Sequence, residues 1–393
     1  MISSRIEGIS FSGTMEIAAK IIELKSKGND VIDLCVGEPD LPTPEYVKNA
    51  AINAIKENKT RYTLNTGIKE LRTAIKEKFQ KEYGANYSES EIIISNGAKQ
   101  AVFNALQTIV ENGDEVLIAK PFYVSYPHMV KLAGGIPVFI ETQKSNNFKP
   151  TLSEIKSCLT AKSKVLIICN PDNPTGTIFT KNELNELMEF AYENKIFVLA
   201  DEIYEKLIYN DAVFVSAASL GEKYKDNLII INGVSKTYSM TGWRIGYAVA
   251  PKKIIEGMSK LQSHSTSNAC TISQYASLAA LTNSQDTVEA QRKIFEERRN
   301  FIKDSLLGIN DVSFIEPSGA FYYFIDISGI IDKHSSIKNS RDFCLQLLDM
   351  QNVAAVPGIE FGMENYIRIS YAKSMEELKE AVIRIKKFIL QLK

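Results

Sequence analysis

The sequence predicts an α/β protein in two parts: a large domain built on a mostly parallel seven-stranded sheet flanked by helices, and a smaller α+β domain. Short β-branched runs alternate with helical stretches through the middle of the chain, which is typical of a parallel sheet. The pattern changes near residue 282, where a long polar helix is expected. The length of 393 residues exceeds the usual size of one hydrophobic core, although one large domain remains the alternative.

The expected strands of the large sheet are short apolar runs bounded by polar or turn-forming residues. Their ranges are 91–95, 115–119, 136–141, 164–169, 196–200, 228–231 and 244–250. Helices are expected between them. Pro44, preceded by Thr43, suits the first position of a helix. Three further helix starts are indicated by a Ser or Thr followed three residues later by a Glu. They are Thr151 with Glu154, Thr180 with Glu183, and Ser374 with Glu377.

The C-terminal part is expected to consist of helix 286–307, the strand AFYYFIDI, helix 341–350 and a last helix. No low-complexity linker separates the two parts, so a continuous helix is the expected boundary. We predict a large domain over 42–281 and a small domain formed by 1–41 and 282–393. The first 40 residues could pack with either part.

Charge and composition argue against several classes of partner. Lys plus Arg total 46 and Asp plus Glu total 47, so no net field favours nucleic acid or an acidic membrane. The N-terminus lacks the apolar core of a signal peptide, and no apolar run of membrane-spanning length occurs. We therefore expect a cytoplasmic protein without nucleic-acid or membrane partners.

The cysteines and histidines do not form a recognisable metal or disulfide pattern. The five cysteines are odd in number and never form a C-x-x-C pair, which favours reduced thiols. The three histidines are far apart, so neither a metal site nor histidine catalysis is expected.

The most informative segment is GVSKTYSMTGWRIG, residues 233–246. It places Lys236 just after a strand in a turn of small residues, with Arg244 eight positions later. A lysine whose pKa is depressed can trap a carbonyl group, and Ser235 and Arg244 suit a phosphate. A surface loop with a solvated lysine and arginine explains the same residues if the segment is considered alone.

This segment resembles the lysine attachment site of class I pyridoxal-phosphate-dependent aminotransferases. Further stretches are similar to that family in the same order: VGEPD, RYT, NGAKQAVFNAL, PFYVSYP, NPDNPTG, ADEIYE, SGAFY and YIRISYA. The resemblance extends from about residue 12 to the C-terminus and is closest to the prokaryotic aspartate aminotransferases. It implies the fold of pyridoxal-phosphate-dependent transferases of fold type I, with pyridoxal 5'-phosphate as cofactor.

The resemblance assigns Lys236 to the Schiff base with the cofactor and to proton transfer. It implies that Asn173 and Tyr204 bind the 3'-oxygen of the cofactor and that Asp201 pairs with the pyridinium nitrogen. Turn formation and helix capping explain Asn173 and Asp201 if the family is set aside. Tyr123 would stack on the cofactor ring, where close relatives have tryptophan; a core aromatic is the alternative.

The phosphate is assigned to Ser235, Arg244 and the backbone at Gly97 and Ala98, where a helix begins. Many relatives have a hydroxyl residue near Ala98, so its absence puts more of the binding on Ser235 and Arg244. Tyr62 matches a tyrosine that reaches the phosphate of the neighbouring subunit, although it could be a surface aromatic. The match implies a homodimer with shared active sites.

Arg368, in a probable strand, is implied to bind the substrate α-carboxylate, for which its planar fork is suited. A structural ion pair is the alternative. Gly37 and Asn173 would add substrate contacts, and Lys99 would neutralise the distal carboxylate of aspartate or glutamate unless it is a solvated surface lysine. Ser12 and Thr14 match a segment near that carboxylate but are too common a pattern to carry weight.

The resemblance implies transfer of an amino group from an amino acid, aspartate in the first place, to a 2-oxo acid such as 2-oxoglutarate by ping-pong kinetics. Specificity for aromatic substrates, alanine or prephenate is an alternative, as is a β-lyase with the same cofactor shell. A non-catalytic binding module is a third possibility, which the intact Lys236, Asp201 and Arg368 argue against.

Overall fold

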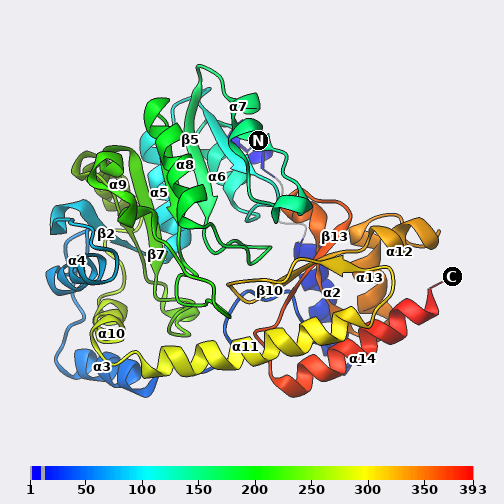
Figure 1. Ribbon diagram of the computed structural model, residues 1–393. Helices are drawn as coiled ribbons and strands as arrows, with labels where there is room; N and C mark the ends of the chain where they lie inside the picture. Colours follow the sequence, from blue (N-terminus) through cyan, green and yellow to red (C-terminus); the bar gives the residue numbers. More distant parts are fainter. Residues whose placement is uncertain (1, 10–13, 393) are drawn as a thin grey trace.

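The computed structural model describes residues 2–9 and 14–392 and is built around a seven-stranded sheet with the order β2-β8-β7-β6-β5-β3-β4 (Figure 1). Neighbouring strands are parallel from β7 to β4, whereas β8 runs antiparallel to both β7 and β2. The strands are β2 Ile92–Ser95, β3 Glu115–Ala119, β4 Ile136–Ile140, β5 Ser163–Cys169, β6 Phe197–Asp201, β7 Leu228–Gly233 and β8 Gly246–Val249. The mostly parallel seven-stranded sheet is therefore confirmed.

Both faces of this sheet are buried, which is why its strands are nearly continuous runs of apolar residues. Side chains alternate along β2: Ile93 packs against the helices of one face, and Ile92 and Ile94 pack against those of the other. The first group is α5 Ala98–Ile109, α6 Tyr126–Leu132 and α9 Lys252–Ser263. The opposite group is α3 Glu45–Lys56, α4 Lys69–Tyr83, α8 Lys181–Glu193 and α10 Thr271–Thr282, with the short α7 Leu152–Cys158 nearby.

The predicted helix starts are confirmed with one exception. Reciprocal capping boxes form at Thr151, Thr180 and Ser374, each with the glutamate three residues later. Pro44 was predicted as the first helical residue, but α3 begins one residue later, at Glu45. Thr43 does not cap the helix, because its hydroxyl donates instead to the carbonyl oxygen of Ser239 at 2.6 Å.

The C-terminal part contains a four-stranded antiparallel sheet with the order β12-β13-β10-β9. Its strands are β9 Ser313–Phe314, β10 Tyr322–Asp326, β12 Val356–Pro357 and β13 Tyr366–Ser370, and its helices are α12 Ser328–Lys333, α13 Ser340–Gln351 and α14 Met375–Gln391. A separate two-stranded sheet joins β1 Ile32–Asp33 to β11 Val353–Ala354. The N-terminal α1 Ser4–Glu7 and α2 Thr14–Ser26 precede it.

The long helix α11, Asp286–Leu307, extends from the side of α3 and α10 to that of α14, as Figure 1 shows. Its bounds match the predicted helix. Ile17 and Ile21 of α2 and Leu34 pack into the same hydrophobic cluster as β10, β13 and α14. The N-terminal segment thus contacts the C-terminal part, while the division into 42–281 and 1–41 with 282–393 stays a prediction.

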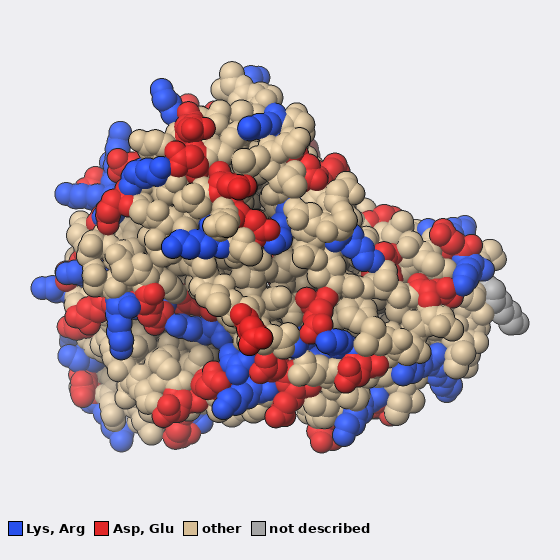
Figure 2. Space-filling model, viewed as in Figure 1, with Lys and Arg blue, Asp and Glu red and all other residues tan. Residues whose placement is uncertain are grey.

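Lys and Arg side chains alternate with Asp and Glu on the face seen in Figure 2, and neither sign forms a continuous patch there. Within the described ranges, none of the helices combines the length and the apolar character needed to cross a membrane.

Candidate active site

A cavity of about 500 Å³ opens at the carboxyl ends of the parallel strands, where ligands of open α/β sheets bind. Its wall is completed by α2 and by the four-stranded sheet. The predicted site residues that line it are Gly37, Ala98, Lys99, Tyr123, Asn173, Asp201, Tyr204, Ser235, Lys236, Arg244 and Arg368. Residues spread over most of the chain are thus brought into one space.

Lys236 lies in the loop that joins β7 to β8, two strands that pair directly with each other. Its Nζ donates a hydrogen bond to the carbonyl oxygen of Gly37. The pKa of Lys236 is lowered to about 8, mainly by burial; Glu38 and Asp201 act to raise it, and Arg244 and Arg368 act to lower it. A lysine with this pKa has about a tenth of its amine in the neutral, nucleophilic form at pH 7, far more than an ordinary lysine.

Asp201 is the last residue of β6 and is buried, with 6% of its surface exposed. Tyr126 Oη donates to its Oδ2 at 2.8 Å, and the backbone amide of Ile203 donates to Oδ1 at 3.3 Å. Burial raises the pKa of Asp201 to about 6, although these hydrogen bonds and Lys236 favour the charged form. A buried carboxylate of this kind is suited to a cationic partner supplied by a ligand.

Gly97, Ala98 and Arg244 form a compact corner of the site. Gly97 precedes α5 with a φ of 88°, and a Cβ placed on it would come within 2.3 Å of Arg244 Nη2. A side chain at position 97 would therefore displace the guanidinium. The first backbone hydrogen bond of α5 is donated by Gln100 to the carbonyl oxygen of Gly97, at 3.1 Å. The amides of Ala98 and Lys99 precede it, so this corner offers donors suited to a phosphate together with Arg244 and the buried Ser235.

Arg368 is a buried residue of β13, on the opposite wall of the cavity. Its Nη1 donates to Asn173 Oδ1 at 3.0 Å and its Nη2 donates to the carbonyl oxygen of Cys35 at 2.7 Å. The guanidinium lies 4.3 Å from the centroid of the Tyr322 ring. No carboxylate is within ion-pairing distance of Arg368 among the described residues, so the structural ion pair weighed from the sequence is not observed. The fork is positioned for an anion that arrives with a ligand.

Tyr204 and Tyr123 contribute rings to the two sides of the cavity. The hydroxyl groups of Tyr204 and Tyr322 are hydrogen-bonded at 2.9 Å. Tyr123 packs edge-on against Tyr126, with 5.3 Å between ring centroids, and the exposed Lys99 holds its Nζ 5.5 Å from the Tyr123 ring centroid. Tyr123 therefore lines the cavity instead of being enclosed in the core.

Two parts of the predicted site lie elsewhere. Tyr62 does not line the cavity of its own chain, and 89% of its surface is exposed. Gly97 contributes through its contact with Arg244 and not as a lining residue. Ser12 and the side chain of Thr14 lie outside the described part of the structure.

Known proteins with this arrangement were found by sequence and by structure. The model of the family "Aminotransferase class I and II" matches residues 29–385. The chain belongs to this family. It is 44% identical over 389 residues to the aspartate aminotransferase of Bacillus sp. (strain YM-2), covering 99% of each chain. It is 41% identical to the probable aspartate/prephenate aminotransferase of Aquifex aeolicus, over 100% of this chain and 99% of that one.

The fold of this aminotransferase is shared with solved structures. The aspartate aminotransferase of Rhizobium meliloti superposes with a TM-score of 0.96 at 39% identity, and the match covers 100% of both chains. The α/β class with its flanked parallel sheet is therefore the fold of the family's enzymes as well as that of this chain.

Several residues of the aminotransferase site were not singled out from the sequence. Tyr126, Cys169 and Tyr322 line the cavity, and Thr241 Oγ1 donates to Glu38 Oε2 at 2.8 Å at its edge. Tyr126 was visible in PFYVSYP, three residues after Tyr123, but its partner Asp201 is 75 positions away. Contacts across such separations leave no local pattern that would identify them.

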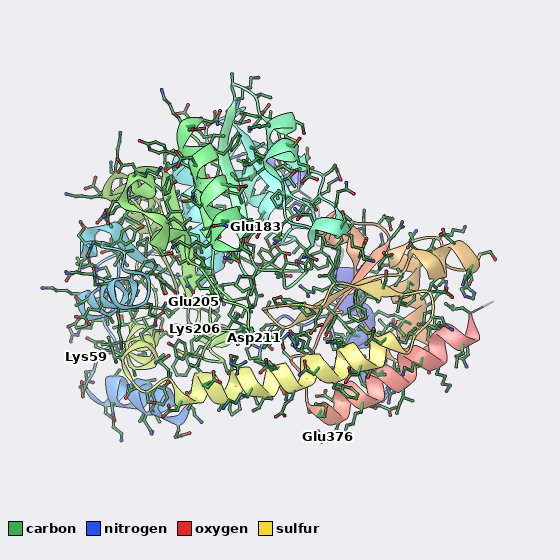
Figure 3. The ribbon with its side chains drawn as sticks, viewed as in Figure 1. Lys59, Glu183, Glu205, Lys206, Asp211 and Glu376 are labelled. Carbon is green, nitrogen blue, oxygen red and sulfur yellow. The ribbon has the colours of Figure 1, made fainter. Side chains whose placement is uncertain are left out.

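A second group of charges, centred on the buried Glu205, does not line the cavity. Lys78 Nζ forms ion pairs with Glu205 at 2.9 Å and Glu82 at 2.8 Å, and Lys206 pairs with Glu82 at 2.7 Å. Figure 3 labels Glu205 and Lys206, which are adjacent on the segment after β6. Because the charges are paired with each other, this group has the character of a structural network.

Proposed function

We propose that this aminotransferase uses pyridoxal 5'-phosphate to transfer the amino group of aspartate to 2-oxoglutarate. The observation that carries the proposal is the single cavity in which the amine of Lys236, the buried carboxylate of Asp201 and the fork of Arg368 face one another. The printed names of the relatives, aspartate aminotransferase and aspartate/prephenate aminotransferase, support the choice of aspartate.

The residues present fit pyridoxal phosphate. Asp201 offers an anionic partner for the pyridinium nitrogen, and the corner of Gly97, Ala98 and Arg244 offers donors for the phosphate. Asn173 and Tyr204 also line the cavity and offer an amide and a hydroxyl group for the 3'-oxygen. The Nε of Arg368 is buried without a hydrogen-bond partner, as expected of a group that awaits an anionic ligand.

When bound, the cofactor supplies electron withdrawal from the substrate Cα and a place to keep the amino group between the two half-reactions. Lys236 Nζ would take the proton from the substrate Cα and hold it within the cavity, for which a pKa near 8 is well matched. Arg368 and Asn173 orient the α-carboxylate of the substrate. Tyr126 and the amide of Ile203 keep Asp201 in place.

Lys99 is the residue through which we expect the enzyme to select a dicarboxylic substrate. It is at the exposed end of the cavity, where its ammonium group is free to meet a distal carboxylate. Aromatic amino acids, alanine and prephenate are the alternative substrates to be assayed. A β-lyase of the same fold would release pyruvate and ammonia without needing a 2-oxo acid.

We further propose a homodimer with shared sites, acting in the cytoplasm. The exposed Tyr62 and Leu64, with 89% and 65% of their surfaces accessible, are suited to contact a second subunit. Mixing Lys236→Ala subunits with Tyr62→Ala subunits should then restore activity, because a mixed dimer contains one site with both residues. Mixing without any gain in activity would rule out the shared site.

The main experiment is an assay of the purified protein. Bound cofactor should absorb in the near-ultraviolet or visible range. Aspartate alone should react no more than once per site, and continued turnover with ping-pong kinetics should need a 2-oxo acid. The donor panel includes alanine and aromatic amino acids, and the acceptors are oxaloacetate, 2-oxoglutarate and prephenate. No amino transfer with any acceptor, or pyruvate and ammonia release instead, would refute the proposal.

A further inference from the structure

Helix α11 contacts two loops that meet at Lys236. Gln291 and Arg298 are seven positions apart on α11, so their side chains lie on nearly the same face, about 10 Å apart along the axis. Both are buried, with 6% and 7% of their surfaces exposed. Neither lines the cavity, so any effect on the chemistry must act through other residues.

Gln291 holds the loop that carries the lysine. Its Nε2 donates to the carbonyl oxygen of Lys236 at 2.9 Å, and its Oε1 accepts from Ser239 Oγ at 2.6 Å. Ser239 has a φ of 51°, in the left-handed region that costs a non-glycine residue about 1 kcal/mol. The amide of Gln291 therefore stabilises a loop conformation that the backbone would otherwise disfavour.

Arg298 holds the loop that faces the lysine. Its Nη1 and Nη2 donate to Asp40 Oδ1 and Oδ2 at 2.6 Å and 2.9 Å, in the two-point geometry that fixes orientation as well as distance. Asp40 is three residues after Gly37, whose carbonyl oxygen accepts from Lys236 Nζ. The ion pair therefore fixes the segment that receives the lysine.

The two loops are also joined directly to each other. Besides the bond from Lys236 Nζ to Gly37, Thr241 Oγ1 donates to Glu38 Oε2 at 2.8 Å. Helix α11 is thus bonded to the loop that contains Lys236 and to the loop that contains Gly37, and these two loops are bonded to each other. The helix fixes the distance between the two loops.

We propose that Gln291 and Arg298 are positioning residues that set the place of Lys236 Nζ by holding its two flanking loops on one rigid helix. This inference rests on the proposed role of Lys236. The helix is the longest in the described part of the chain, and its regular hydrogen bonding keeps the two contacts at a constant separation. Loss of either contact leaves the fold intact but lets the amine move towards solvent.

The charged groups around Lys236 determine what such a movement would do. Glu38 of the Gly37 loop, Arg244 of the lysine loop, Asp201 of β6 and Arg368 of β13 all act on its amine, and burial acts most strongly. Loosening a loop reduces the burial, so the amine should titrate closer to an ordinary lysine, at about 10.4.

The test measures Lys236 itself in protein freed of cofactor. Acetylation of Lys236 by acetic anhydride is followed by peptide mass spectrometry as a function of pH, for the natural chain and for Gln291→Met, Arg298→Lys and Asp40→Asn. We expect the midpoint to rise by about one pH unit in Gln291→Met, and by less in Arg298→Lys, which keeps the charge but loses the fork. With cofactor, kcat should fall about 10-fold while KM changes little.

Arg299→Met is the matched control. Arg299 is buried on the same helix, but it donates to the carbonyl oxygen of Pro317 at 3.2 Å and pairs with Glu316, away from Lys236. It should lower the unfolding temperature without moving the midpoint. An unchanged midpoint in Gln291→Met and Asp40→Asn, or an equal shift in Arg299→Met, would overturn the inference. Failure of the natural chain to bind pyridoxal phosphate would instead count against the proposed function, so the two failures are distinguishable.

Discussion

The two ends of the cavity differ in how firmly the chain fixes their side chains. At the buried end, Asp201 and Arg368 are almost fully enclosed, and hydrogen bonds from or to named partners determine where their polar atoms lie. At the open end, Lys99 is exposed and its ammonium group lies over the Tyr123 ring, while Tyr62 lies outside the cavity. The side chains of the first end are thus fixed by contacts within the chain, whereas those of the second are left accessible.

This contrast distinguishes the residues proposed for the chemical reaction from those proposed for substrate selection. In the proposed function, the buried end contains the groups that act on the atoms common to all amino acids. The shifted pKa values of Lys236, about 8, and of Asp201, about 6, come mainly from burial. The open end meets the part of the substrate that varies. Substitutions at the buried end should therefore affect every substrate, and those at the open end only some.

Lys236→Ala should have the largest effect, because it removes the amine that the proposed function assigns both to cofactor attachment and to proton transfer. We expect turnover to fall at least about 10⁴-fold with every donor, together with loss of the near-ultraviolet or visible absorption shift on cofactor addition. Steady-state assays and absorption spectra check this. Undiminished turnover with any donor would show that the buried end does not contain the reacting amine.

Arg368→Lys should weaken the binding of all donors by about 100-fold, since a lysine keeps the charge but cannot form the two-point contact with a carboxylate. The loss should appear in KM with aspartate and with alanine alike. A loss confined to aspartate would mean that Arg368 binds the distal carboxylate. Substrate selection would then lie at the buried end of the cavity instead of the open end.

Asp201→Asn should stabilise the cofactor-free protein at pH 7.5. Burial raises the pKa of Asp201 to about 6 in the folded chain, above its unfolded value, so ionisation at pH 7.5 opposes folding. The gain should be about 2 kcal/mol in urea unfolding and should disappear as the pH falls from 6 towards 4, where the folded carboxyl is protonated. Saturating cofactor should reverse the order of stability. A variant less stable than the natural chain at pH 7.5 would contradict this.

Lys99→Ala should have the smallest effect and the narrowest. We expect kcat/KM to fall about 5- to 10-fold for aspartate, because an exposed charge pair contributes about 1 kcal/mol, and to stay unchanged for alanine. Comparing the two donors in one assay provides the internal control. Full aspartate activity in this variant would remove Lys99 from substrate selection.

The sequence was sufficient for the parts of the fold that depend on neighbouring residues. Buried parallel strands such as β3 are continuous apolar runs, and capping boxes such as Thr180 with Glu183 are complete within four residues. The predicted start of β8 was wrong. Arg244 was expected in the strand, but it has a φ of 58° and the strand begins at Gly246. A positive φ at an arginine depends on tertiary contacts and has no sequence signal.

The site could be predicted only where a resemblance supplied the roles. Lys236, Asp201 and Arg368 were identified in this way, and the structure brings them into one cavity. The hydrogen bonds from Tyr126 to Asp201 and from Arg298 to Asp40 were not identified, since the partners are 75 and 258 positions apart. Such pairs are determined by the packing of the sheet and of α11, which no local pattern encodes.

The antiparallel pairing of β8 with β7 affects how this site can change during evolution. The segment from Val234 to Ile245 leaves the sheet at Gly233 and returns at Gly246, and these two glycines are paired with each other. Lys236 and Arg244 therefore lie on one short loop whose two ends are held together by the sheet. Arg368 belongs to a different sheet, so the position of its guanidinium can change with the packing of the four-stranded sheet while the loop of Lys236 and Arg244 is retained.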